Sequence, residues 1–281
     1  MQSLQIQSLT KQYKGFLLDN VTFTVPRGAV VGLIGENGAG KSTILGSVLG
    51  TVHPNGGSVL LDGRQIGELS LGEKQKIAFV QDTACLPVEL SVRMMDKVFS
   101  HIFLKWNSER FFALCKKFSL PEKKAVKKFS KGMLMKTAIA VALSYESELL
   151  VLDEPTSGLD PVVRDEILEM VYDYMQGGDK AVLISSHITS DLEKICDIIV
   201  YVHEGKVLFD EEKDALLERF VQFSCEKAAL RELDPNCVER VLYREYGADV
   251  LVPKQCLPQG FSHKGVSLDE IMLFYAKGER L

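Results

Sequence analysis

The chain has 281 residues, of which 46% are hydrophobic and 25% charged, enough for one large domain or for one domain with an appendage. It has no apolar stretch long enough to span a bilayer and no apolar signal-peptide core near its start, so we expect a cytoplasmic protein. The net charge of −5 argues against general nucleic-acid binding, and the six cysteines, none in a zinc-ligand spacing, are expected to be reduced structural thiols.

The first part of the chain is predicted to be β-structure. Residues 21–25 alternate apolar and polar side chains, the pattern of a half-buried strand. Residues 58–66 contain an Asp-Gly pair, a turn signal that predicts a hairpin. Residues 29–35 are a continuous apolar run, typical of a strand buried on both faces, and lead through glycines into a helix predicted over 41–50.

The middle of the chain is predicted to be mostly helical over 91–145, where Phe111, Cys115 and Phe118 fall on one helix face. Two further buried strands are predicted at 148–154 and 181–187, each followed by a helix. Strands that alternate with helices indicate an α/β fold with a parallel sheet.

The last part of the chain has a different pattern. Residues 198–210 predict a closing pair of strands, and the pattern changes after about residue 220. A hairpin is predicted over 238–252, and a terminal helix over 267–278 begins with a capping box of Ser267 and Glu270. We therefore expect residues 221–281 to form a small α+β appendage.

The segment GENGAGKST, residues 35–43, fits the phosphate-binding pattern G-x-x-x-x-G-K-[ST] and lies between a predicted strand and a predicted helix. Glycines let successive amide groups point inward, and the helix N-terminus adds partial positive charge. Lys41 would reach the β- and γ-phosphates, and Ser42 would ligate Mg²⁺. The residues expected to bind the nucleotide here are Gly35, Asn37, Gly38, Gly40, Lys41, Ser42 and Thr43.

The segment LLVLDEP, residues 149–155, ends a buried strand in two carboxylates. Ligands bind at such strand ends in parallel sheets, so Asp153 is placed to hold Mg²⁺ and Glu154 to orient and deprotonate an attacking water. Acidic residues also end strands for structural reasons. The phosphate loop upstream on the same sheet favours the functional interpretation.

The run VLDEPTSGLDP at 151–161, with the phosphate loop upstream and Ser-Ser-His downstream, resembles the ATPase subunit of an ABC transporter over about residues 4–215. The resemblance implies ATP and Mg²⁺ as cofactors. It also implies a P-loop NTPase fold with a mostly parallel central sheet, an N-terminal antiparallel β subdomain and a helical subdomain at about 88–145. We expect an ATPase domain over 1–220 and an accessory domain over 221–281.

The resemblance assigns roles to further residues. Gln81 would sense the γ-phosphate and Mg²⁺, His187 would contact the γ-phosphate, and Asp160 would cross a dimer interface, although Asp160 before Pro161 is also a good helix N-cap. Tyr13 would stack on adenine; a plain surface or core aromatic is the alternative.

The segment FSKGM, residues 129–133, stands where the family has a glycine-rich signature. Ser130 and Gly132 remain, whereas Lys131 and Met133 replace the usual Gly and Gln. In the family this segment closes the ATP held by a second subunit, so we expect a working signature. The Lys131 side chain would add charge near the γ-phosphate or point to solvent. The form is similar to that of bacterial ABC-2-type, YtrB-like exporter ATPases.

These features predict an ATP-hydrolysing motor with a second ATPase subunit, a homodimer rather than a heterodimer, and separate transmembrane permease subunits. The protein would then be peripheral on the inner face of the cell membrane and drive export of a peptide, antibiotic or lipid-like substrate. The alternatives are a non-transport ABC ATPase of translation or DNA maintenance and a nucleotide-binding regulatory module that does not hydrolyse.

The sequence leaves the roles of two segments undecided. Residues 86–99 form either core or the socket for the permease. Residues 105–136 hold ten Lys or Arg and only two acidic residues. Four of these lysines lie near the membrane or the ATP interface, or else they form an ordinary solvated face: Lys123, Lys124, Lys127 and Lys128.

Overall fold

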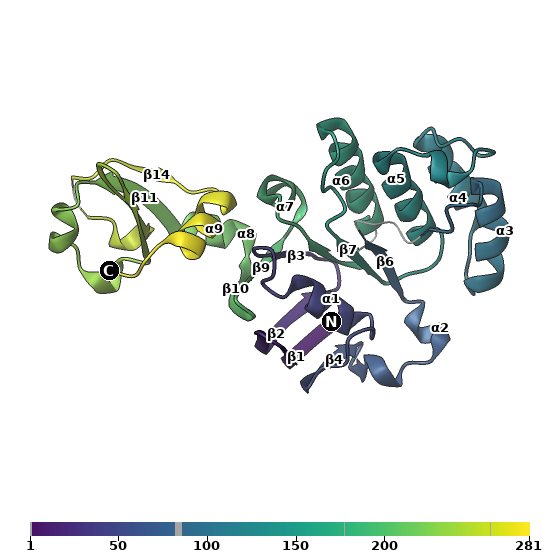
Figure 1. Ribbon diagram of the computed structural model, residues 1–281, viewed down its shortest axis with the longest axis horizontal. Coiled ribbons are helices and arrows are strands. Elements are labelled where there is room, and N and C mark those ends of the chain that lie inside the picture. The colour runs from purple at the N-terminus through teal and green to yellow at the C-terminus, as the bar shows by residue number, and fades with distance from the viewer. Residues whose placement is uncertain (1, 82–85, 177, 259) are drawn as a thin grey trace.

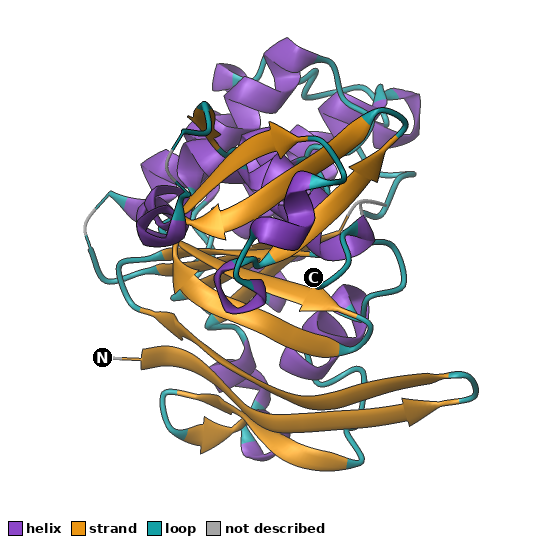
Figure 2. Cartoon of the chain, turned by 90° about the vertical axis from the view of Figure 1, so that its left-hand side faces the viewer, coloured by secondary structure: helices purple, strands orange, loops and turns teal. Residues whose placement is uncertain are grey.

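The computed structural model describes residues 2–81, 86–176, 178–258 and 260–281. The strands of these residues form three sheets. The molecule is elongated: the N-terminal sheet lies below the central sheet, the C-terminal sheet lies at one end, and α3 lies at the other (Figure 1). Figure 2, turned by 90°, shows the long strands of the N-terminal sheet separated from the C-terminal sheet.

The N-terminal sheet is antiparallel, in the order β2-β1-β4-β5. Its strands are β1 (Gln2–Tyr13), β2 (Phe16–Pro26), β4 (Gly56–Leu61) and β5 (Arg64–Gln65). Buried and exposed residues alternate in the second half of β2, which confirms the predicted half-buried strand. Asp62 and Gly63 join β4 to β5 with positive φ angles of 49° and 79°, as a tight two-residue hairpin requires.

The central sheet follows the order β10-β9-β3-β8-β7-β6. Its strands are β3 (Val30–Ile34), β6 (Ile77–Gln81), β7 (Leu149–Asp153), β8 (Ala181–Ser185), β9 (Ile198–His203) and β10 (Lys206–Glu212). All neighbours are parallel except β10, which closes the sheet as an antiparallel edge. The predicted mostly parallel α/β sheet is therefore confirmed.

The described residues form α-helices between and after the strands. They are α1 (Lys41–Val48), α2 (Leu71–Lys74), α3 (Val92–Ile102), α4 (Ser108–Lys117), α5 (Lys131–Ala142), α6 (Pro161–Met175), α7 (Thr189–Ile195), α8 (Lys213–Arg219) and α9 (Leu268–Lys277). Short 3₁₀ turns are η1 (Ile66–Glu68), η2 (Val126–Lys128), η3 (Ala229–Glu232), η4 (Pro235–Cys237) and η5 (Lys254–Cys256).

Both faces of the central sheet are covered, which explains its continuous apolar strands. Leu150 and Leu152 of β7 point into a core shared with α5, α6 and α7, whereas Leu149 and Val151 point into a core shared with α1 and the N-terminal sheet. Successive residues of a strand face opposite ways, so a strand between two cores must be apolar throughout.

The predicted helical region is confirmed by α3, α4 and α5. Phe111, Cys115 and Phe118 are buried on one side of α4 and its C-terminal end, as its spacing predicts. Burial raises the pKa of the Cys115 thiol to about 12, which keeps it protonated and unreactive. The cysteines of the described residues are free thiols, and Cys85 lies outside the described residues.

The C-terminal region forms an antiparallel sheet in the order β12-β13-β11-β14. Its strands are β11 (Phe220–Cys225), β12 (Arg240–Arg244), β13 (Gly247–Pro253) and β14 (His263–Gly265). The predicted hairpin is β12–β13, and the predicted capping box of Ser267 and Glu270 begins α9. The sequence did not predict β14.

Helix α9 packs back onto the central sheet. Its Phe274 lies in the same apolar core as Tyr201 of β9 and Phe209 of β10. At its N-terminus, the Leu268 amide donates a 2.6 Å hydrogen bond to the carboxylate of Glu193 on α7. The C-terminal region thus shares a core with the rest of the chain, and the domain boundary after residue 220 stays a prediction.

In the described part of the chain, no helix combines the length and apolar character that a membrane crossing requires.

Candidate functional site

The phosphate loop connects β3 to α1 and depends on its glycines. Gly35, Gly38 and Gly40 have φ angles of 157°, 86° and 116°, which side chains disfavour. A Cβ on Gly35 would lie 2.3 Å from the carbonyl oxygen of Val202 on the neighbouring strand β9. The loop therefore follows a path that glycine alone permits at this position.

Lys41 begins α1 and is buried, at 7% exposure. Its Nζ donates to the carbonyl oxygens of Gly35 at 2.7 Å and Glu36 at 3.3 Å. Burial lowers the pKa of Lys41, while the carboxylates of Glu154 and Asp153 oppose that shift. The ammonium is thus held over the loop by backbone oxygens, where a phosphate oxygen can compete for it.

The residues predicted to bind the nucleotide lie around Lys41 in the loop and in the start of α1. Asn37 and Gly38 are exposed at the turn of the loop, Ser42 is exposed in the first turn of α1, and Thr43 is half-buried. The first amide groups of a helix have no intrahelical acceptor. Those of α1 therefore point toward the loop opening, which favours an anion there.

Three strands of the central sheet end side by side with polar residues. Gln81 at the end of β6 is in register with Asp153 of β7, which is in register with Ser185 of β8. The Ser185 hydroxyl donates a 2.6 Å hydrogen bond to Asp153 Oδ1. The sequence brought out Gln81 and Asp153 but gave Ser185 no role, although it lies in the quoted Ser-Ser-His run.

Glu154 lies directly after this row of strand ends. Its φ is 50°, uncommon for a residue with a side chain, and its amide donates to the Ser185 carbonyl oxygen at 3.1 Å and the Ser185 hydroxyl at 3.2 Å. Glu154 Oε2 accepts a 2.6 Å hydrogen bond from His187 Nδ1, and Oε1 lies 4.0 Å from Lys41 Nζ. The structure thus brings Lys41, Glu154 and His187 together.

The residues predicted to hold Mg²⁺ fit that ion. Ser42, Gln81 and Asp153 offer hydroxyl, amide and carboxylate oxygens, the hard ligands that Mg²⁺ prefers, and a nucleotide would supply phosphate oxygens. Among the described residues, His, Cys, Asp and Glu form no cluster of three or more that could hold a metal by themselves. A weakly chelating site of this kind suits an ion that arrives with its nucleotide.

The predicted adenine residue, Tyr13, ends β1 and is 41% exposed. Its ring centroid lies 6.5 Å from that of Phe16. Phe16 lines a cavity of about 450 Å³ beside the phosphate loop, and its ring is 3.1 Å from where a Cβ on Gly40 would be. The sequence singled out Tyr13 alone. Phe16 is itself an aromatic residue three positions after Tyr13, and that short spacing was the signal that could have identified it.

The FSKGM segment forms the start of α5. Ser130 is the N-cap and accepts a 3.3 Å hydrogen bond from the Met133 amide, and Lys131 is the first helical residue. Lys131 therefore has an ordinary helical backbone and needs no glycine conformation. The helix directs the amide groups of Lys131 and Gly132 outward beside the exposed Ser130 hydroxyl.

The Lys131 side chain lies against a neighbouring loop of the same chain. Its Nζ is 3.3 Å from where a Cβ on Gly158 would be, and a Cβ on Gly132 would meet Val163 of α6 at 3.1 Å. Asp160 caps α6 by accepting hydrogen bonds from the amides of Val162 at 3.2 Å and Val163 at 3.1 Å. The signature segment and the loop before α6 are thus adjacent.

The structure does not join these residues to the phosphate loop. Within the described residues, the recorded hydrogen bonds of Ser130 and Asp160 run to the helix amides that follow them. The predicted site residues thus form two groups in one chain: one around Lys41 and Glu154, the other around Ser130 and Asp160.

Comparison with known proteins identifies the family of the chain. A family model described as ABC transporter matches residues 18–157. The chain is 38% identical over 214 residues to the lantibiotic transport ATP-binding protein SrtF of Streptococcus pyogenes, covering 75% of this chain and 91% of the relative. It is 33% identical to the ABC-type transporter ATP-binding protein EcsA of Bacillus subtilis, covering 83% and 95%. The ABC transporter ATP-binding protein YtrB of the same species is 24% identical and aligns over 99% of both chains.

Solved structures show the same fold. An ATP-binding subunit of an ABC transporter matches with a TM-score of 0.70 and 30% identity, covering 76% of this chain and 91% of the other. A dimeric bacterial ABC transporter cassette matches with a TM-score of 0.66 and 23% identity, covering 74% and 98%. The chain belongs to the family of ABC transporter ATP-binding proteins.

Proposed function

We propose that the protein hydrolyses ATP as the motor subunit of a membrane ABC exporter. The observation that carries the proposal is the position of Glu154, with one carboxylate oxygen 2.6 Å from His187 and the other 4.0 Å from the phosphate-loop lysine, Lys41. A carboxylate next to the phosphate end of a nucleotide site can accept a proton from water. The non-hydrolysing alternative would leave this arrangement without a use.

The chemistry follows from these positions. Lys41 and the loop amides bind the β- and γ-phosphates, and Tyr13, with Phe16 beside it, faces the adenine. Glu154 orients the attacking water and takes its proton, and His187 fixes the Glu154 carboxylate and contacts the γ-phosphate. Mg²⁺, held by Ser42, Asp153 and Gln81, would neutralise charge on the phosphate oxygens.

A second copy of the chain completes the site. The exposed Ser130 hydroxyl and the outward amides of α5 are suited to bind phosphate oxygens, yet they belong to the group apart from Lys41. Head-to-tail pairing of two copies would place Ser130 and Gly132 of one subunit on the ATP of the other, with Asp160 at the interface. ATP would then clamp the two subunits, and hydrolysis would release them.

An exposed apolar surface on α2 and α3 is proposed to dock the permease. Met94, Val98 and Ile102 recur every four residues on one exposed side of α3, and Leu71 and Leu104 are 83% and 77% exposed. Gln75, directly after α2, hydrogen-bonds to the backbone of residues 102 and 104 and so holds the end of α3 beside α2. Membrane attachment would come through this contact.

We propose that the transporter works as an exporter and that its substrate is an amphipathic peptide, antibiotic or lipid-like molecule. Support comes from relatives named for lantibiotic transport and for Nod factor export. A non-transport ABC ATPase is the competing function, and nothing in the described residues favours it over the permease surface.

Two measurements test the function. Lys41→Ala should abolish ATP turnover, with Lys194→Ala as a control, because Lys194 forms an exposed ion pair with Asp165. Normal hydrolysis by Lys41→Ala would contradict the assignment. Co-purification of a polytopic membrane protein, lost in Leu104→Asp with ATP turnover retained, would support the exporter; failure of any membrane protein to co-purify with the wild type would favour the non-transport ATPase.

A further inference from the structure

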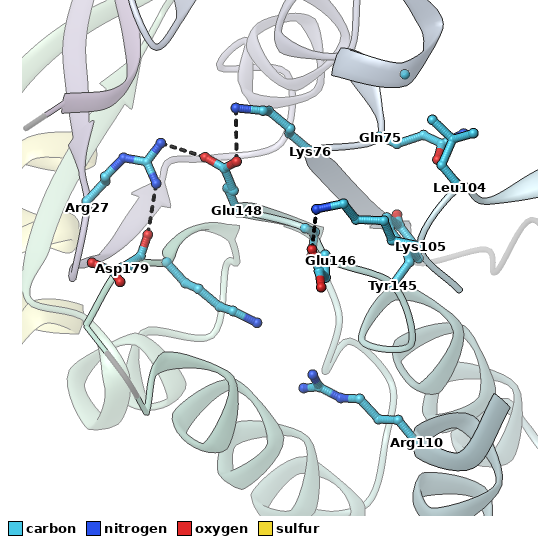
Figure 3. A pocket seen from close by; sticks show the side chains of 13 residues that line it. Arg27, Gln75, Lys76, Leu104, Lys105, Arg110, Tyr145, Glu146, Glu148 and Asp179 are labelled. Atoms are coloured by element: carbon cyan, nitrogen blue, oxygen red, sulfur yellow. Dashed lines mark hydrogen bonds and ion pairs between the residues drawn. The ribbon is translucent and has the colours of Figure 1, made fainter. Parts of the chain in front are cut away.

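A cavity of about 570 Å³ lies between α4 and the central sheet and plays no part in the proposed ATP chemistry (Figure 3). Its floor is formed where strands begin: Lys76 precedes β6, Glu148 precedes β7 and Lys180 precedes β8. The opposite wall is formed by α4, from which Arg110 reaches toward the cavity. Its size is typical of pockets that hold small ligands.

The cavity is on the opposite edge of the sheet from the nucleotide site. The strands β6, β7 and β8 carry Gln81, Asp153 and Ser185 at their carboxyl ends and the cavity at their amino ends. A strand of five residues spans about 16 Å. A ligand here would therefore leave the ATP site unobstructed.

The charge of the cavity is positive although the whole chain is negative. Five cationic side chains and three carboxylates line it, which leaves a net charge of +2. Arg27 and Lys76 both pair with Glu148, and Lys105 pairs with Glu146, as the dashed lines in Figure 3 show. Asp62, outside the cavity lining, also pairs with Arg27 and Lys76, so these three cations are neutralised within the protein.

Arg110 and Lys180 carry the remaining positive charge, and Asp179 is the remaining carboxylate of the lining. Neither forms an ion pair with any residue in the described part of the chain. Lys180 Nζ lies 4.2 Å from the centre of the Tyr174 ring, and the Tyr174 hydroxyl is fixed by a 3.1 Å hydrogen bond to the Ser147 carbonyl oxygen.

Burial, and next the positive charge of Arg110, lower the pKa of Lys180. The carboxylate of Glu146, which also lines the cavity, opposes that shift. Two like charges thus face one cavity, and neither is ion-paired in the described part of the chain.

We propose that this cavity binds a small phosphorylated ligand, with its phosphate between Arg110 and Lys180 and its carbon skeleton against Leu104 and Tyr145. A phosphate monoester carries a charge of about −1.5 to −2 at neutral pH, which complements the positive charges of Arg110 and Lys180. The planar guanidinium of Arg110 can bind two phosphate oxygens, and the Lys180 ammonium supplies a point charge. The ligand would also tie α4 to the edge of the central sheet.

The phosphate group of the ligand could belong either to a soluble metabolite or to the headgroup of a phospholipid. The experiment uses the full chain, saturated with ADP and Mg²⁺ so that the phosphate loop is occupied. Glycerol 3-phosphate is titrated by calorimetry. In parallel, sedimentation measures binding to phosphatidylcholine vesicles with and without phosphatidic acid, which carries the same phosphomonoester on a lipid.

Arg110→Ala and Lys180→Ala are each expected to weaken binding at least tenfold. Arg110 is exposed, so its replacement should leave the fold intact. The matched control is Lys117→Ala on the same helix, because Lys117 pairs with Asp173 outside the cavity. Loss in the two variants with either probe, and not in the control, supports the site and identifies the source. The proposal is overturned if neither probe binds, if Arg110→Ala binds as the wild type does, or if the control loses binding equally.

Discussion

Glu154→Gln is the change that tests the proposed chemistry most directly. Glutamine has the shape of glutamate and can keep a hydrogen bond to His187 Nδ1, which lies 2.6 Å from Oε2, but it cannot take a proton from water. A positioned general base contributes about 10²- to 10⁴-fold in rate, so the barrier should rise by about 3–5 kcal/mol. The variant also removes a negative charge 4.0 Å from Lys41, so ATP affinity should be unchanged or higher.

The assay is single-turnover ATP hydrolysis with Mg²⁺, together with gel filtration in the presence of ATP. The variant should bind ATP, hydrolyse it at least 100-fold more slowly and elute as a stable dimer. Glu89→Gln is the matched control, because Glu89 is an exposed carboxylate paired with Lys127. Hydrolysis within threefold of the wild type, or loss of ATP binding along with hydrolysis, would refute the role of Glu154 as a base.

Three further predictions concern single side chains. His187→Ala removes the hydrogen bond that fixes Glu154, so steady-state turnover should fall roughly 10- to 100-fold, or about 1.4–2.7 kcal/mol, with ATP affinity nearly unchanged. Lys131→Gly should leave hydrolysis within about tenfold, or about 1.4 kcal/mol, if only backbone amides act; a larger loss would show that the side chain near Gly158 takes part. Phe274→Ala should lower the free energy of unfolding by about 3–5 kcal/mol in urea titrations, because Phe274 is 1% exposed. Tyr246→Ala, at 89% exposure, should leave it unchanged and serves as the control.

Local sequence patterns were sufficient to predict much of the fold and the positions of the site residues around Lys41 and Glu154. The buried strands at β3, β7 and β8 have continuous apolar runs, since each lies between two cores. The phosphate loop and the acidic strand end follow such runs directly, so their positions could be predicted once the strands were known.

Contacts between distant segments could not be predicted in this way. Strand β14 is a short exposed segment whose pairing with β11 depends on the register of the C-terminal sheet. The approach of Phe16 to Gly40 and of Lys131 to Gly158 joins residues more than 20 positions apart. No local period encodes such pairs, because they depend on how whole elements pack.

The docking of α9 on the central sheet has a consequence for synthesis of the protein. Tyr201 and Phe209 both pack against the ring of Tyr275 on α9, at ring-centroid distances of 6.0 and 5.5 Å, and Tyr275 is made about 66 residues after Phe209. At roughly 5–20 residues per second, the ribosome needs about 3–13 seconds to add that length. During this interval the nascent chain exposes an aromatic surface that helix α9 will cover, and we expect chaperones to bind there first.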